Sequence, residues 1–141
     1  MKKYIVLISI IVIIVSAVVY FYYQKQIDSN AILNNNKNYT ALNGKEITGT
    51  ELATLINKTI NKNVQNNVEK DSKGIFKDNS KDSINIEVKF KQIDETIPEE
   101  KIEENDISKF IQYYSTVNFK CTNIEYHQNT NYVKYLYFEE E

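Results

Sequence analysis

Residues 4–23 read YIVLISIIVIIVSAVVYFYY, twenty consecutive positions without a charged side chain. A helix of twenty residues rises about 30 Å, which matches the hydrocarbon thickness of a lipid bilayer. Thirteen of these residues are Ile, Val, Leu or Phe, and each favours insertion by roughly 0.3 to 0.6 kcal/mol. The stretch predicts one transmembrane helix over Tyr4–Tyr23.

The residues that flank this stretch predict its orientation. Lys2 and Lys3 precede it, whereas Lys25 is closely followed by Asp28, and residues 20–23 form an aromatic cluster suited to an interface. Because positive charge is retained in the cytoplasm, we expect a single-pass protein of the cell membrane with a cytoplasmic N-terminus. The part of the chain after the helix is then extracytoplasmic.

Three kinds of processing compete with a retained anchor. Residues 15–17, Val-Ser-Ala, resemble a signal-peptide cleavage site, so a secreted protein cut after Ala17 is an alternative. The apolar run continues to Phe21, which favours retention. A prepilin site requires a glycine before the apolar run, and none is present, so prepilin processing is not expected. A lipoprotein requires a cysteine directly after the run, but the single cysteine is Cys121, so lipoprotein processing is not expected either.

Composition divides the chain into an anchor (1–23), a polar, Asn-rich stalk (24–43) and an extracytoplasmic domain (44–141). After residue 24, Leu, Ile, Val and Phe supply 29 of 117 residues, enough for a modest core. From residue 24 onward 15 Lys face 19 Asp and Glu, and the chain has no Arg. No basic patch of the kind that binds nucleic acid is visible.

The clearest helix of the domain is predicted over Ile47–Lys62. Thr48 and Glu51 have the spacing of a capping box, and Ile47 and Leu52 occupy the positions of a hydrophobic staple. A second helical segment is predicted over Ile97–Tyr114, with Pro98 at its first helical position and Asn105-Asp106 as the cap of a second piece.

Strands are predicted from residues 83–91, SINIEVKFK, in which apolar and polar residues alternate. Val117–His127 and Tyr132–Glu139 predict a hairpin, with a bulge near Thr122-Asn123 where the alternation shifts. Short strands around Val68 and residues 75–76 flank a turn at residues 71–74. The fold class expected is α+β, a small antiparallel sheet with two helices on one face.

Candidate chemistry is sparse. Cys121 and His127 suggest a thiol and a base, but they are six positions apart on one predicted strand, a distance of about 20 Å. A buried Cys and an exposed His are expected instead. Asp78, Ser80 and Asp82 alternate like calcium ligands, yet the glycine and the distal Glu of a calcium loop are missing. We expect a solvated turn there.

An acidic run gives the remaining hint of catalysis. Paired carboxylates can hydrolyse glycosides, but these residues are predicted to lie on an exposed, solvated helix face; they are Glu99, Glu100, Glu103 and Glu104, beside Asp94 and Glu95. We therefore predict a domain without enzymatic activity, cofactor or metal. An enzyme that acts on the cell wall is the third hypothesis, after a protein-binding domain and a structural subunit of an assembly.

Tyrosines are the most suggestive feature for binding. Tyr135 and Tyr137 are predicted to share a strand face with Val133, while Leu136 and Phe138 take the other. Since tyrosine is frequent at protein interfaces, a partner surface is predicted at Tyr126, Tyr132, Tyr135 and Tyr137. Ordinary cross-strand packing of aromatic rings within the sheet is the alternative.

Residues 43–52, NGKEITGTEL, lie just beyond the predicted anchor and resemble a segment of small N-terminally membrane-anchored proteins of AT-rich Gram-positive bacteria. Residues 83–90 and 119–127 resemble stretches of the same family. The resemblance implies an anchored envelope protein with no assigned activity. We expect it to bind an envelope protein, and a structural subunit of a pilus-like or secretion assembly is the alternative.

Overall fold

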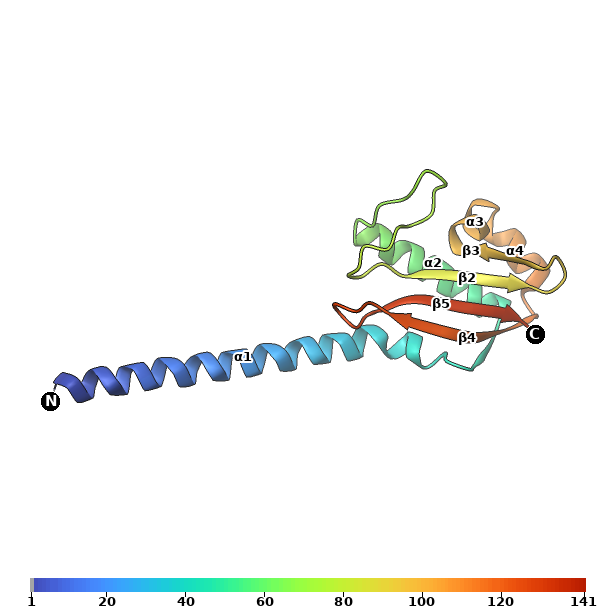
Figure 1. Cartoon of the computed structure of the whole chain (residues 1–141). Coiled ribbons are helices and arrows are strands. Elements are labelled where there is room, and N and C mark those ends of the chain that lie inside the picture. Colours follow the sequence, from blue (N-terminus) through green and yellow to red (C-terminus); the bar gives the residue numbers. More distant parts are fainter. Residues whose placement is uncertain (1) are drawn as a thin grey trace. The chain divides into compact units, whose positions relative to one another are not determined.

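The computed structural model describes residues 2–141, and their side chains from residue 8 onward. It begins with α1, a single helix over Lys2–Thr40 (Figure 1). Within the described residues α1 is long enough and apolar enough to cross a membrane, a property that signal sequences share. The chain forms two compact units, 1–34 and 35–141.

The second unit includes the last turns of α1. The segment expected to be a stalk is helical to Thr40, and within it Tyr39 is only 2% exposed. The Asn36 amide donates to the carbonyl of Asn131 at 2.7 Å and accepts the N–H of Val133 at 3.0 Å. The compact unit therefore starts at Asn35, whereas composition alone suggests a start at Gly44.

The second unit contains one sheet of five strands, in the order β1-β4-β5-β2-β3. All neighbours pair antiparallel except β2 and β5, which pair parallel. This mostly antiparallel sheet with helices confirms the predicted α+β class. The strands are β1 (Glu46–Thr48), β2 (Asn85–Phe90), β3 (Glu95–Pro98), β4 (Asn118–Tyr126) and β5 (Val133–Glu140).

Helix α2 (Gly49–Gln65) confirms the predicted capping box. The Thr48 hydroxyl accepts the Glu51 N–H, and the Glu51 carboxylate accepts the Thr48 N–H at 2.7 Å. Ile47 and Leu52, the two staple positions, are both in the core. The cap fixes where α2 starts, and the staple holds that end against the sheet.

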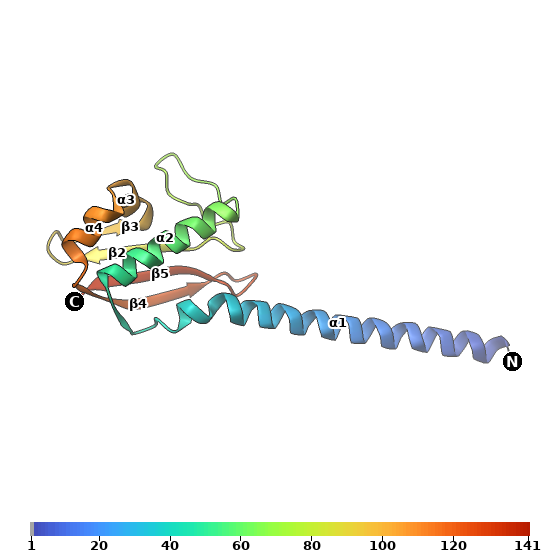
Figure 2. The ribbon, with the colours of Figure 1, turned by 180° about the vertical axis from the view of Figure 1, so that it is seen from behind.

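The second predicted helical segment is divided into α3 (Glu99–Glu104) and α4 (Ile107–Tyr114). Asp106 caps α4 by accepting the Ser108 N–H, as expected. Pro98 is the N-cap of α3 and ends β3, so it precedes the first helical position. Helices α2, α3 and α4 cover one face of the sheet (Figures 1 and 2).

The core lies between those helices and the sheet. Ile86, Val88 and Phe90 alternate inward along β2 and are fully or nearly fully buried, which confirms the predicted register. The Phe90 ring meets those of Phe110 and Phe119 edge-on, with centroids 6.2 and 6.0 Å apart. This aromatic cluster joins α4 to strands β2 and β4 of the sheet.

Two local expectations change in the structure. The strands predicted on either side of the 71–74 turn are reduced to a single bridge, Lys70 to Phe76. The predicted bulge at Thr122 is confirmed, but a second irregularity at Lys134 was not expected. Val133 was predicted to share a face with Tyr135 and Tyr137. Because Lys134 interrupts the alternation, Val133 instead faces the core.

Candidate functional site

The sheet face opposite α2, α3 and α4 (the open sheet face; Figures 1 and 2) contains a polar hollow of about 460 Å³. Strands β2, β4 and β5 build it, because their outward residues alternate with the buried ones. The preceding 78–83 loop closes one side. The lining residues are Asp78, Ser83, Asn85, Asn123, Glu125, Lys134, Tyr135 and Tyr137.

Tyr135 and Tyr137 stand side by side in this hollow. Their ring centroids are 6.4 Å apart and their planes differ by 21°. The Tyr135 hydroxyl donates to the Glu87 carboxylate at 2.7 Å, and the Tyr137 hydroxyl lies 3.3 Å from that of Thr96. Burial, and then the Glu87 carboxylate, raise the Tyr135 pKa above its ordinary value. Tyr135 is therefore a neutral donor at physiological pH.

The charge around the tyrosines is predominantly negative. Glu125 and Asp78 line the hollow, and Glu87 adjoins it through Tyr135. Lys134 is the one cation among the lining residues, and its ammonium group already lies 3.0 Å from the Glu125 carboxylate. The surface thus combines two aromatic rings with carboxylate and amide acceptors.

The other two predicted tyrosines lie elsewhere. Tyr126 is 43% exposed and lines an adjoining hollow of about 250 Å³ at the end of the hairpin, together with His127 and Asp78. Tyr132 is half-buried in the loop between β4 and β5. The structure thus brings Tyr135 and Tyr137 together and adds Glu87 and Asp78, which come from distant parts of the sequence.

His127 is buried, only 2% exposed, so the expected exposed position was wrong. Its Nε2 lies 2.7 Å from the Ser83 carbonyl and its Nδ1 lies 3.4 Å from an Asp78 carboxylate oxygen. Burial raises the pKa of the Cys121 thiol to about 11. A protonated thiol is a poor nucleophile at neutral pH, and the hydrogen-bond partner of this thiol is the Asn123 carbonyl.

The 78–83 loop uses its oxygens on its own backbone. Asp78 accepts the Ser80 N–H at 2.6 Å, and the Asn79 side chain accepts the N–H groups of Lys81, Asp82 and Ser83. Side chains that already satisfy local N–H groups form a turn, in line with the expected turn. Among the described residues no three His, Cys, Asp or Glu side chains are grouped to hold a metal.

Two members of the acidic run are buried, which contradicts the predicted solvated face. Glu99 is 0% and Glu100 is 1% exposed, whereas Glu103 and Glu104 are exposed. Glu99 accepts from the Thr59 hydroxyl, and Glu100 accepts the Phe76 N–H at 2.8 Å. Burial raises the pKa of both carboxyls. Their partners tie α3 to α2 and to the 66–84 loop.

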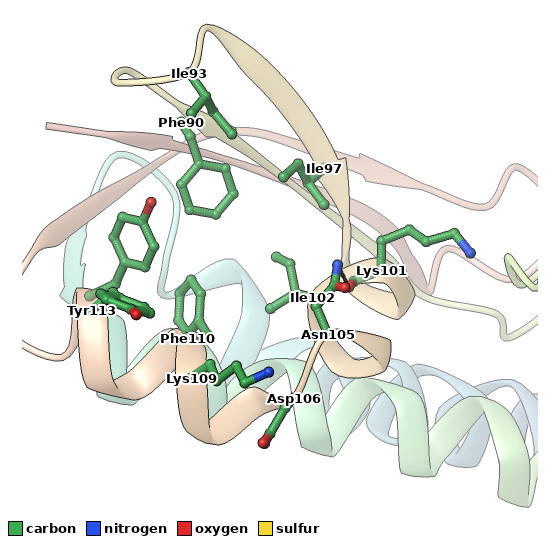
Figure 3. Close-up of a pocket in the computed structure, with 11 residues that line it drawn as sticks. Phe90, Ile93, Ile97, Lys101, Ile102, Asn105, Asp106, Lys109, Phe110 and Tyr113 are labelled. Atoms are coloured by element: carbon green, nitrogen blue, oxygen red, sulfur yellow. Dashed lines mark hydrogen bonds between the residues drawn. The ribbon is translucent and has the colours of Figure 1, made fainter.

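A second, apolar pocket of about 340 Å³ was not predicted. Figure 3 shows Phe90, Ile93 and Ile97 of the β2–β3 hairpin on one side, and Ile102, Phe110 and Tyr113 of α3 and α4 on the other. Ile93 and Tyr113 are exposed apolar side chains at this pocket. The hairpin turn that carries Ile93 gave no periodic signal, so the pocket is visible only in three dimensions.

Comparison of the chain with protein-family models, with curated proteins and with solved structures found no match.

Proposed function

We propose that this chain is a single-pass membrane protein whose C-terminal domain lies outside the cytoplasm and binds another envelope protein. The apolar helix and the lysines before it support the placement. The observation that carries the binding role is the open sheet face with its paired Tyr135 and Tyr137. Half-buried aromatic rings beside polar groups are typical of interface anchors.

Topology is tested by labelling cysteines in intact cells with a membrane-impermeant maleimide. The full chain carries Cys121→Ala, to remove the buried native thiol, and Asn57→Cys, an exposed position on α2. We expect labelling of Asn57→Cys before lysis. A control cysteine inserted after Met1 is expected to react only after lysis. Labelling in the opposite order would refute the orientation. Cell fractionation also distinguishes the alternatives, because a retained anchor keeps the full-length protein in the membrane, whereas cleavage after Ala17 releases a shorter protein.

Binding is tested by photo-crosslinking in living cells. A photoreactive phenylalanine analogue replaces Tyr137 in the full chain. The same analogue replaces Glu103, an exposed residue of α3 outside both pockets, as the control. We expect a discrete protein adduct from position 137 that disappears when Tyr135→Ser is added. Adducts from both positions alike, or from neither, would count against a binding surface on the open sheet face.

A further inference from the structure

We infer that the occupant of the open sheet face is an extended, cationic segment of the partner protein, carrying Arg or Lys side chains. The inference deepens the proposed function and rests on it. It starts from the charge of the hollow. Asp78, Glu87 and Glu125 surround the tyrosine pair, and Lys134 neutralises only part of that charge. A cation is therefore attracted to this hollow and an anion is repelled. Two further lysines of this face, Lys89 and Lys120, each lie opposite Glu139, outside the hollow.

The carboxylates retain the capacity to bind such a cation. An ionised carboxylate has about four lone-pair positions. Glu87 uses one for the Tyr135 hydroxyl, and Glu125 uses two, one for Lys134 and one for the Asn123 amide. The side chains of Asp78 and Glu125 are 55% and 47% exposed, so an incoming guanidinium or ammonium group reaches them from solvent. Charge-assisted hydrogen bonds of this kind are the stronger class.

The tyrosine rings provide a second favourable interaction for a cationic side chain. A cation above an aromatic face is held by the ring's quadrupole, and a guanidinium stacks there while its N–H groups bond carboxylates. Tyr135 and Tyr137 lie between Glu87 on β2 and Glu125 on β4. Their order across the sheet places aromatic faces between two carboxylates.

Amide groups beside the carboxylates fit the backbone of a peptide. Asn85 and Asn123 line the hollow. The Asn85 amide already donates to the Phe76 carbonyl and the Asn123 amide to the Glu125 carboxylate, which leaves each amide a second N–H to donate to a carbonyl. A lone cation needs no such groups, whereas an extended segment presents a backbone N–H and C=O at every residue. The combination favours a basic segment over a free ion.

The test measures peptide binding to the full chain in detergent micelles, by fluorescence anisotropy of labelled tetra-arginine, tetra-lysine and tetra-glutamate. We expect the two basic peptides to bind, with an affinity that falls as salt rises, and tetra-glutamate not to bind. The double variant Glu87→Gln, Glu125→Gln is expected to weaken tetra-arginine binding about tenfold or more. Tyr137→Ser is expected to weaken tetra-arginine more than tetra-lysine.

The matched control is Glu95→Gln, Glu103→Gln, which removes the same charge from two exposed glutamates outside the hollow. It is expected to retain the affinity of the unmodified chain. Equal losses in both double variants, or no binding of the basic peptides, would overturn the inference. If the analogue at position 137 still crosslinks a protein, and the Glu87→Gln, Glu125→Gln variant leaves that crosslink unchanged, the cationic occupant is refuted and the proposed function stands.

Discussion

The buried side chain of Asn63 makes two hydrogen bonds to one residue, donating to the Ile84 carbonyl at 2.6 Å and accepting the Ile84 N–H at 2.9 Å. An amide that pairs with a backbone N–H and C=O in this way replaces a strand partner. It joins the last turn of α2 to the residue that precedes β2. Ile84 thereby satisfies both backbone groups before the ladder starts.

Asn63→Ala is expected to lower the free energy of unfolding by about 2–4 kcal/mol, because it leaves a buried N–H and a buried C=O without partners. Asn61→Ala, an exposed position on the same helix, is the control and is expected to change stability by less than about 0.5 kcal/mol. Urea unfolding of the two variants measures the difference. Similar midpoints would show that Ile84 finds other partners.

Burial of Glu99 and Glu100 predicts that stability falls as pH rises. Each folded pKa lies above the ordinary value of 4.5, so the native state binds more protons than the unfolded state above that pH. The stabilisation is complete below about pH 4.5 and is lost as pH rises through the folded pKa values. Unfolding followed from pH 4 to pH 8 should show this decline.

The variants Glu99→Gln and Glu100→Gln isolate the contribution of each carboxyl, because glutamine keeps the shape and does not titrate. Each is expected to flatten the decline and to gain stability relative to the parent near neutral pH. Glu103→Gln, an exposed neighbour on α3, is expected to leave the pH profile unchanged. Two outcomes would contradict this prediction: a stability of the parent that rises between pH 4 and pH 8, or a decline that is the same in both glutamine variants as in the parent.

Gly49 is predicted to tolerate no side chain. A Cβ at this position would lie 1.9 Å from the Tyr114 carbonyl oxygen, so α2 and the end of α4 would have to separate. Gly49→Ala is expected to cost about 3 kcal/mol or more. At Gly44 the φ angle is +70° and a Cβ meets nothing within 4 Å, so Gly44→Ala is expected to cost about 1–2 kcal/mol of backbone strain. Denaturant midpoints rank the two.

The position of Tyr39 predicts where the domain can be cut. A chain that begins at Asn35 is expected to unfold cooperatively in urea. A chain that begins at Gly44 loses the buried Tyr39 ring and the Asn36 amide, which satisfies the Val133 N–H. The shorter chain is expected to be about 3–5 kcal/mol less stable. Equal midpoints would show that the end of α1 contributes nothing to the core.

What the sequence predicted correctly is local. The capping box at Thr48 and Glu51 and the alternation through residues 84–90 involve residues a few positions apart, and their physics needs no distant partner. The burial of Tyr39 and Glu99 could not be predicted, because an Asn-rich run and an acidic run both resemble solvated segments. Their partners lie far away in sequence: Thr59 is 40 positions from Glu99.

The candidate site shows the same division. The spacing of Tyr135 and Tyr137 predicted that they share a face. Their neighbour Glu87 lies 48 residues earlier than Tyr135, and it reaches the hydroxyl only because β2 pairs parallel with β5. Alternation reveals which face a residue takes, but not which strand lies beside it or in which direction. The acidic character of the hollow could therefore be recognised only once the order and direction of the strands were known.

Strand β5 follows the other four strands in the sequence, yet it lies third of five in the sheet, between β4 and β2. Until it is synthesised, the two halves of the sheet have no common strand and Phe138 and Leu136 are missing from the core. Under the proposed topology, the anchor enters the membrane long before β5 leaves the ribosome. The domain would therefore cross the membrane as an unfolded chain and fold on the outer side, after β5 has been translocated.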